Sequence, residues 1–359
     1  MRIGLVLPST PGYSETFFTN KIRGLKAEGY EVILFVGAKK RIGFQEAKVY
    51  YGPFLSENVL SKFIVSSFSV LKVVSQAPSV SIRFLRLEIN SGSSVLEAVR
   101  RLVICSHILP HKLEWLHFGF ATMGIDRELV GKTIRARLAV SFRGYDISVY
   151  PIKHKGCYKR LFSHIDKVHT ISDDLLDIAY RTGLPKTIPV VKITPAINTK
   201  IFTNIRQSFF TGETINIVTI ARLHWKKGLE YTLEALSKLK EDGVSFRYRI
   251  IGEGSEFERL VFARHQLGLQ DYVEFSGKIS HNEIPGILKE GDIYLQYSLQ
   301  EGFCNAVLEA QAAGMLCIVS DAEGLSENVI DGQTGWVVPK RRPDLLVQKI
   351  LEVINMPKD

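Results

Sequence analysis

Short apolar runs alternate with amphipathic helical patterns along most of this chain. The first run, Ile3–Leu7, is followed by a helical pattern that places Phe18, Ile22 and Leu25 on one face, and then by a second run, Val32–Val36. A strand, a helix and a second strand in this order form a βαβ unit, whose two strands run parallel. The chain is therefore predicted to fold as an α/β protein with parallel sheets.

The same alternation continues and then starts again in the second half. After the run at residues 215–221, a helix is expected in which Leu229, Leu233 and Leu236 share one face. Two successive βα sets predict two Rossmann-like, doubly wound domains. The other strands are expected at 138–142, 168–171, 189–193, 248–251, 273–275, 293–296 and 316–320, and the other helices at 256–266 and 304–313.

The length of 359 residues agrees with two domains at about 150 residues each. We expect a first domain at 1–200, a polar linker at 201–214 and a second domain at 215–342. The remaining residues, 343–359, are expected to contain one C-terminal helix.

The net charge of +9 is unevenly distributed. Residues 1–165 contain 24 Lys and Arg against 11 Asp and Glu, whereas residues 166–359 contain 22 against 26. A basic half and a slightly acidic half indicate that the two domains meet different partners.

Several classes of protein are not expected from the composition. The four cysteines are far apart and form no CxxC pair, which argues against a disulfide framework or a zinc site. The apolar segment 63–71 is closed by Lys62 and Lys72, and no uncharged run reaches the 18–20 residues, roughly, of a membrane span. The N-terminus lacks the features of a signal peptide. A cytoplasmic protein is expected.

The region between about residues 50 and 108 has two interpretations. Its apolar residues are interrupted by basic ones, among them Arg83, Arg86, Arg100 and Arg101. It would form either amphipathic helices whose basic edge faces an anionic membrane, or ordinary surface helices packed on the sheet.

Two polar segments follow expected strands of the second half. Glu301-Gly302-Phe303-Cys304-Asn305 follows the strand at 293–296 and opens a helix that contains Glu309. Ligands of open α/β sheets bind at the carboxyl ends of strands, and a helix N-terminus favours an anion. A carboxylate accepts hydrogen bonds from two neighbouring hydroxyls, so Glu301 and Glu309 suit a sugar or ribose. The alternative is a loop carboxylate and a helix-surface glutamate without function.

The second segment, Arg222-Leu223-His224-Trp225-Lys226-Lys227-Gly228, follows the strand at 215–221. Its cations beside a helix start would neutralise a diphosphate. A solvated basic turn is the alternative.

Taken together, these segments resemble the donor-site signature of the family 4 glycosyltransferases of the GT-B fold, in which two Rossmann-like domains face each other across a cleft. The resemblance covers nearly the whole chain, and its first-half motifs resemble the subgroup that builds bacterial exopolysaccharide and lipopolysaccharide. The further matching motifs lie at 14–17, 116–119, 142–146, 252–254, 273–280 and 323–335.

The resemblance implies roles for individual residues of the second half. Arg222 and Lys227 would bind the donor diphosphate and stabilise the leaving nucleotide, because that group gains negative charge as the glycosidic bond breaks. Glu309 would hold the ribose and Glu301 the hydroxyls of the donor sugar. The remaining donor-binding residues would be Gly254, Ile279, Phe303, Cys304 and Asn305, largely through their backbone.

In the first half, the resemblance implies that His117 contacts the transferred sugar and that Gly12 lets the first loop approach the diphosphate. Acceptor or phosphate contacts are expected from Ser14, Glu15, Arg143 and Asp146. The family usually has histidine at the position of Arg143, and an arginine cannot act as a base, so we expect an acceptor, phosphate or structural role there.

The family retains anomeric configuration, so the resemblance implies a retaining reaction. The family needs no bound metal or cofactor, so no metal and no cofactor are expected here. The predicted donor is a UDP- or GDP-sugar and the predicted acceptor is a saccharide or a lipid-linked saccharide, with an anionic membrane surface as a further partner of the basic domain. Family members usually run further, with a last helix that crosses back onto the first domain. In this sequence we expect a crossover that is short or truncated.

Three alternatives remain. A non-catalytic sugar-nucleotide-binding partner subunit would keep Arg222 and Glu309 and lack turnover. A nucleic-acid-binding protein would use the basic half, although no recognisable module is present there. A dinucleotide-dependent oxidoreductase needs a G-x-G-x-x-G motif after its first strand, where this chain has only Gly12. We therefore take glycosyl transfer as the leading hypothesis.

Overall fold

The computed structural model describes residues 1–12, 16–37, 44–55, 57–202, 210 and 213–356. The chain divides into two compact units, Met1–Ile193 and Thr194–Asp359. The division falls seven residues before the end of the predicted first domain, and most of the predicted linker lies outside the described residues.

The first unit is built on a parallel sheet of seven strands in the order β3-β2-β1-β4-β5-β6-β7. The first strand, β1, lies inside the sheet, and the chain adds strands first on one side of it and then on the other, which is a doubly wound arrangement. The strands are β1 (Arg2–Leu7), β2 (Glu31–Val36), β3 (Lys48–Tyr51), β4 (Trp115–Phe118), β5 (Arg137–Phe142), β6 (Lys167–Thr170) and β7 (Val190–Lys192).

Helix α1 of the first unit packs on this sheet through its apolar face. Phe18 and Ile22 of α1 pack against Leu5 and Leu7 of β1, in agreement with the face that the sequence predicts. The helices are α1 (Thr16–Ala27), α2 (Val59–Gln76), α3 (Pro78–Asn90), α4 (Val95–Cys105), α5 (Val130–Ile134), α6 (Tyr145–Ser148), α7 (Tyr150–Lys153), α8 (Lys159–Phe162) and α9 (Asp173–Arg181).

The second unit has a parallel sheet of six strands in the order β10-β9-β8-β11-β12-β13. Its strands are β8 (Ile215–Ile220), β9 (Phe246–Ile251), β10 (Val273–Gly277), β11 (Ile293–Gln296), β12 (Leu316–Ser320) and β13 (Trp336–Val338). Its helices are α10 (Thr199–Phe202), α11 (Leu229–Glu241), α12 (Phe257–Gln266), α13 (Ile284–Glu290), α14 (Asn305–Ala312) and α15 (Pro343–Ile354).

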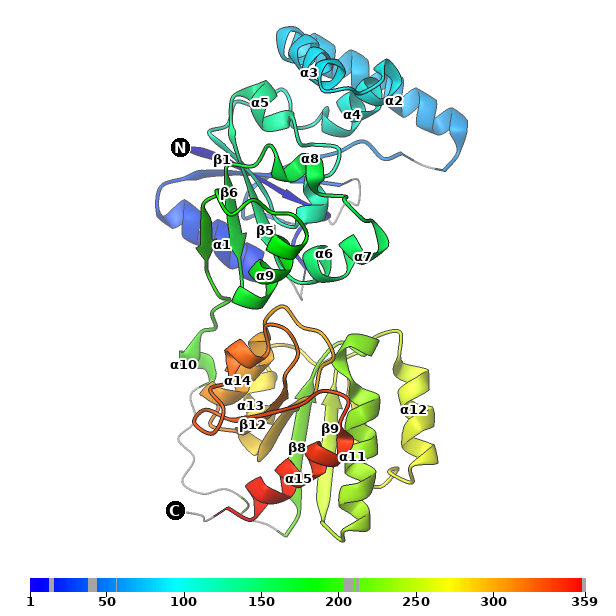
Figure 1. Cartoon of the computed structure of the whole chain (residues 1–359), viewed down its shortest axis with the longest axis vertical. Coiled ribbons are helices and arrows are strands. Elements are labelled where there is room, and N and C mark those ends of the chain that lie inside the picture. The colour runs from blue at the N-terminus through cyan, green and yellow to red at the C-terminus, as the bar shows by residue number, and fades with distance from the viewer. Residues whose placement is uncertain (13–15, 38–43, 56, 203–209, 211–212, 357–359) are drawn as a thin grey trace. The chain divides into compact units, whose positions relative to one another are not determined.

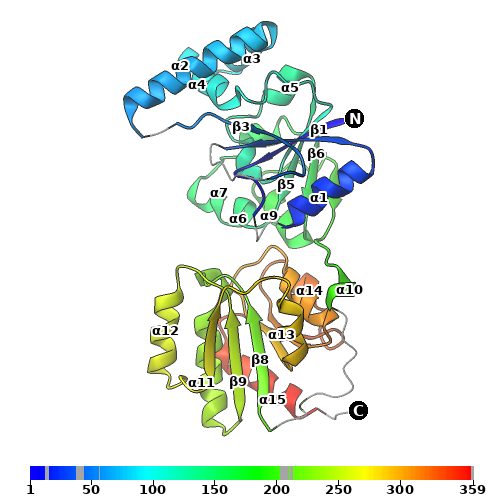
Figure 2. The ribbon, with the colours of Figure 1, turned by 180° about the vertical axis from the view of Figure 1, so that it is seen from behind.

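Helices cover both faces of the second sheet. The leucines of α11 and the apolar residues of α15 share one core with Ile217 and Leu295, while α13 and α14 share the other core with Val218 and Tyr294 (Figures 1 and 2). Neighbouring residues of a strand point to opposite faces, so these strands are buried on both sides and read as continuous apolar runs.

The structure confirms the prediction of two Rossmann-like α/β domains. The sequence analysis missed β3, β4 and β13, which are three or four residues long and only partly buried. The cleft expected between the domains stays a prediction.

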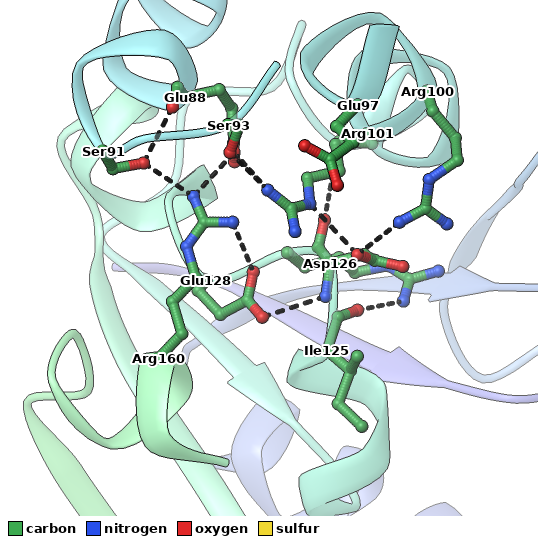
Figure 3. A network of polar contacts seen from close by, with 12 residues as sticks. Glu88, Ser91, Ser93, Glu97, Arg100, Arg101, Ile125, Asp126, Glu128 and Arg160 are labelled. Atoms are coloured by element: carbon green, nitrogen blue, oxygen red, sulfur yellow. Dashed lines mark hydrogen bonds and ion pairs between the residues drawn. The ribbon is translucent and has the colours of Figure 1, made fainter. Parts of the chain in front are cut away.

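A network of charged side chains fixes α3 and α4 to the body of the first unit (Figure 3). The buried carboxylate of Glu88, on α3, accepts hydrogen bonds from Arg101 of α4 at 2.8 Å and from Arg160 of α8 at 2.6 Å. Arg100 and Arg101 also bind Asp126, at 2.7 and 3.0 Å. A buried carboxylate is tolerated because its partners are charged and hydrogen-bonded, and removal of one partner would leave an uncompensated charge.

Helix α2 exposes its apolar side, which is unusual for a helix on the surface of a globular domain. Ser69 and Val73 face the protein, whereas most of its large apolar side chains are exposed. Among the described residues it is the one helix whose length and composition would allow it to cross a membrane, with a mean hydropathy of 1.3 over 18 residues that include two lysines.

Candidate functional site

The predicted donor residues of the second unit lie at the carboxyl ends of its central strands. The loop after β8 carries Arg222 and Lys227, and the loop after β11 carries Glu301. Because β8 and β11 are parallel neighbours, both loops emerge at the same edge of the sheet. This is the edge at which open α/β sheets bind ligands.

An ion pair between Lys227 and Glu301 joins these two loops. Both side chains are largely buried, at 16% and 12% exposed. Burial acts to lower the pKa of Lys227, but the Glu301 carboxylate outweighs it and the pKa is raised, so the amine stays charged. The pair therefore places a compensated positive charge at the carboxyl edge of the sheet.

Buried polar groups of β11 support the Glu301 carboxylate. Ser298 Oγ lies 3.1 Å from Glu301 Oε1 and 2.8 Å from Nε2 of Gln296, whose Oε1 accepts a hydrogen bond from Tyr294. A chain of this kind fixes the carboxylate, because each buried group is satisfied by its neighbour.

Two glycines allow the loops to pack closely. Gly228 has a φ of +59°, and a Cβ atom there would lie 2.2 Å from the carbonyl oxygen of Tyr297. A Cβ atom on Gly254 would lie 2.2 Å from the carbonyl oxygen of Leu223. Larger residues do not fit at either position. The structure therefore places Gly254 behind the loop of Arg222, which gives it a packing role.

The N-terminus of α14 differs in one respect from the predicted anion site. The N–H of Cys304 donates to Oδ1 of Asn328 at 3.0 Å, and Nδ2 of Asn328 donates to the Cys304 carbonyl at 3.1 Å. The Cys304 N–H thus already donates its hydrogen bond to Asn328 and does not point a free N–H at a nucleotide sugar. Phe303 and Asn305 flank it, and Asn305 is the first residue of the helix.

Glu309 lies on α14, two turns from the ion pair in sequence, and is largely buried. Its Oε1 lies 3.2 Å from Nε2 of His281, which follows β10. Burial raises the pKa of Glu309, and the contact with His281 partly offsets this. Ile279 comes from the same segment and packs against the core beneath α14. The predicted donor-binding residues Glu309 and Ile279 therefore come from neighbouring segments, which His281, a residue not predicted from the sequence, connects.

In the first unit, His117 lies in a line of polar side chains on the face of the sheet that α1 covers. Its Nδ1 lies 3.1 Å from Nζ of Lys21, and its Nε2 lies 2.8 Å from Oγ of Ser141. Ser141 Oγ lies 2.8 Å from Nδ1 of His169, whose Nε2 lies 3.2 Å from the carbonyl oxygen of Ile193. Strands β4, β5 and β6 thus contribute one residue each near their carboxyl ends.

The carbonyl end of this line sets the direction of every hydrogen bond in it. A carbonyl only accepts, so Nε2 of His169 carries the proton and its Nδ1 accepts from Ser141. Ser141 then accepts from Nε2–H of His117, and Nδ1 of His117 accepts from Lys21. Burial lowers the pKa of His117 well below its ordinary value, which keeps the ring neutral. His117 is predicted to contact the transferred sugar, and in this structure both of its ring nitrogens have hydrogen-bond partners within the first unit.

The other predicted residues of the first unit have mainly structural contacts. Asp146 is buried and accepts from the N–H groups of Ala121 and Arg143, at 2.9 and 3.0 Å. Both carboxylate oxygens therefore hold the backbone, which is a structural contact, and the predicted contact of Asp146 with acceptor or phosphate stays a prediction. The guanidinium of Arg143 lies 4.1 Å from the ring centre of Phe17, in agreement with a structural role.

Of the remaining predicted positions, Gly12 precedes α1 and is partly buried, and Arg222 is exposed. Ser14 and Glu15 lie outside the described residues. Among the described residues, no three His, Cys, Asp or Glu side chains gather in a way that could hold a metal ion.

Four residues of these two sites were missed by the sequence analysis. Asn328, Ser298 and His281 act through contacts with residues 24, 3 and 28 positions away, and Lys21 contacts a histidine 96 positions away. Only Asn328 and Ser298 carried a signal, because Asn328 falls in a matched motif and Ser298 lies two residues after a predicted strand.

The arrangement of two Rossmann-like units with cations and carboxylates at the strand ends is that of GT-B glycosyltransferases. Two solved structures share the fold: Anabaena HepE in complex with UDP and glucose (TM-score 0.70, 16% identity, 99% of this chain and 90% of that one) and a sucrose-phosphate synthase from Thermosynechococcus elongatus (TM-score 0.70, 15% identity, 99% and 90%).

Relatives in sequence define the family. Residues 201–359 match the family described as glycosyl transferases group 1. The chain is 28% identical to the putative colanic acid biosynthesis glycosyltransferase WcaL of Salmonella typhimurium, over 100% of this chain and 92% of WcaL. It is 30% identical to the amylovoran biosynthesis glycosyltransferase AmsK of Erwinia amylovora, over 66% of this chain and 60% of AmsK. The matched part of the chain, which contains nearly all of the second unit, belongs to this family of glycosyltransferases, as its motifs predicted.

The line of polar groups at His117 leads to a prediction about Lys21. Burial lowers the pKa of this lysine to about 7, and the charge of Arg143 adds to the effect. Lys21 in the folded protein should thus lose its proton near pH 7, whereas in the unfolded chain it keeps the proton up to about pH 10.5. The unfolded state binds more protons between these values, so Lys21 makes the folded state more stable as the pH rises through this window.

The measurement is an NMR titration of ¹³C-labelled lysine side chains, with Lys21→Arg to assign the signal. A midpoint near 7 is expected for Lys21 alone. A midpoint above 9 would show that the amine is solvated and that the line of hydrogen bonds does not form in solution.

Proposed function

We propose that this protein is a retaining glycosyltransferase that moves a hexose-type sugar from a UDP- or GDP-sugar to a saccharide or lipid-linked saccharide. The observation that carries the proposal is the Lys227–Glu301 ion pair at the carboxyl edge of the second sheet, with Glu309 on the adjoining helix. The named products of WcaL and AmsK, colanic acid and amylovoran, support a role in bacterial cell-surface polysaccharide synthesis.

The second unit would bind the nucleotide sugar. Lys227 and Arg222 would contact the diphosphate, and Glu301 would then exchange the Lys227 amine for the hydroxyls of the donor sugar. Glu309 would accept hydrogen bonds from the ribose diol, a role that suits a carboxylate whose one close partner is a histidine. The UDP and glucose bound in the HepE structure make a UDP-sugar the first donor to test.

In the proposed reaction, an acceptor hydroxyl attacks the anomeric carbon from the side of the departing diphosphate. The new C–O bond forms as the bond to the phosphate oxygen breaks, and that oxygen takes the acceptor proton. The nucleoside diphosphate leaves with the bonding electrons, and Lys227 and Arg222 stabilise its charge. We propose that no metal takes part, and that the protein works in the cytoplasm at the inner face of the plasma membrane.

Two substitutions test the assignment of the site. Glu309→Ala and Lys227→Ala should each lower the transfer rate at least about a hundredfold, because each removes a charged contact with the donor. The controls are Glu290→Ala and Lys238→Ala, which replace exposed residues of α13 and α11. Transfer is measured as nucleotide release, and circular dichroism checks the fold. Wild-type rates in Glu309→Ala or Lys227→Ala would contradict the assignment.

A thermal-shift screen against UDP, GDP, ADP and CMP identifies the donor nucleotide. A nucleotide at 100 times its dissociation constant should add about 2.7 kcal/mol to the free energy of unfolding. One nucleoside diphosphate is expected to raise the melting temperature clearly above the others. Stabilisation without any turnover of the matching nucleotide sugars would indicate a non-catalytic partner subunit, and no stabilisation by any of the four would contradict donor binding.

A further inference from the structure

The exposed face of α2 is an apolar surface that the fold leaves unexplained. We define the α2 apolar face by seven side chains that occupy one half of the helix surface and are between 40% and 81% exposed: Val59, Leu60, Phe63, Ile64, Phe68, Leu71 and Val74. Contiguous apolar surface of this kind marks an interaction site in a soluble protein.

Helix α2 turns its apolar side outward, whereas a helix packed on a core turns its apolar side inward. Ser66 is partly buried, and Ser69 and Val73 are buried on the half of the helix that is turned to the protein, where α2 contacts α3 and α4. A surface helix of a globular domain normally turns its apolar stripe inward. The sequence of α2 therefore suits an apolar partner outside the protein.

The exposed charged residues on α2 and α3 are basic, whereas α4 exposes one carboxylate, Glu97, near its start. Lys62 and Lys72 on α2 and Arg86 on α3 are exposed. The carboxylate of α3, Glu88, is buried and bound by two arginines, so it does not offset them. Glu57, just before α2 begins, is the nearest exposed carboxylate in sequence.

The apolar surface continues onto the neighbouring helices. Ile82 and Ile89 on α3 are 51% and 45% exposed, and Val95 and Leu96 at the start of α4 are 67% and 81% exposed. Figures 1 and 2 show α2, α3 and α4 gathered at one end of the first unit. We call these exposed apolar side chains of α2, α3 and α4 the platform.

We propose that the α2 apolar face inserts into the surface of an anionic lipid bilayer, with α2 lying in the plane of the membrane. An amphipathic helix binds such a surface by burying its apolar half among the acyl chains, while lysines and arginines meet the lipid phosphates. A second copy of the chain fits this face less well, because α2 carries two lysines and no carboxylate, so that a two-fold contact between two α2 helices would bring like charges together.

Anchoring of the helices favours the in-plane arrangement over a spanning one. A single residue, Ala77, separates α2 from α3, and Ser81 Oγ donates to the Val73 carbonyl at 3.3 Å. The network of Glu88, Arg101 and Arg160 fixes α3 and α4 to the unit (Figure 3). A spanning α2 would have to give up its buried contacts, whereas an in-plane α2 keeps them.

The proposal goes beyond glycosyl transfer and depends on neither donor nor acceptor. Its first test is sedimentation of the full-length protein with vesicles of phosphatidylcholine and phosphatidylglycerol, and with vesicles of phosphatidylcholine alone. Wild-type protein should bind the mixed vesicles, bind the neutral ones at least tenfold more weakly, and be released as the salt concentration rises.

Substitutions test whether vesicle binding depends on the α2 apolar face or on nonspecific hydrophobic adsorption. Phe63→Glu with Leu71→Glu should weaken binding to mixed vesicles at least tenfold, because the charges oppose insertion. The control is Phe262→Glu on α12, which replaces a phenylalanine of similar exposure, 62% against 70%, and should bind like wild type. Nucleotide-sugar turnover in solution should be the same in all three proteins, so a failed donor assay leaves this test unaffected.

A third readout reports insertion directly. In Phe63→Trp, the indole fluorescence should be quenched by brominated lipids, whereas Phe262→Trp should show no more quenching than the native tryptophans of the wild-type protein. The proposal is overturned if wild-type protein fails to bind mixed vesicles at low salt, if the double variant binds them like wild type, or if position 63 is not quenched. It is also overturned if light scattering without lipid shows a dimer that the double variant dissociates.

Discussion

The ion pair between Lys227 and Glu301 is the contact on which the candidate active site depends. It connects the loops after β8 and β11, and the closely packed Gly228 and a chain of buried hydrogen bonds hold it in place. A buried cation needs a compensating anion, and in the function proposed above a donor diphosphate would take over that role from Glu301 at the same edge of the sheet. The pair therefore keeps a positive site ready and desolvated in the absence of donor.

The two units differ in net charge, and this difference agrees with the separate partners proposed for them. The slightly acidic second unit holds few cations at its site, and these stand at strand ends where a diphosphate would lie. The basic first unit instead carries positive charge over its surface, much of it near the platform of α2, α3 and α4. We infer that this charge serves a membrane on which a lipid-linked acceptor would be found, while His117 and its neighbours form the polar edge of that unit.

Much of this arrangement could be predicted from the sequence, because strands buried on both faces and leucines at helical spacing leave a strong pattern. The pattern in α11 and the strand at 293–296 were found for this reason, whereas the three-residue β13 has no such signal. The site was predicted through motifs, which name residue types. Motifs do not show that the Cys304 N–H donates to Asn328, or that Asp146 accepts hydrogen bonds from two backbone N–H groups. These contacts join distant residues and follow only from packing.

Calorimetric titration of the stabilising nucleoside diphosphate into two variants tests the central claim most directly. Lys227→Met should weaken binding at least tenfold, because the diphosphate loses its buried cation. Glu301→Gln should bind the nucleoside diphosphate as tightly as wild type or more tightly, because Lys227 is no longer neutralised and no donor sugar is present. Wild-type affinity in Lys227→Met, or loss of binding in Glu301→Gln, would contradict the account.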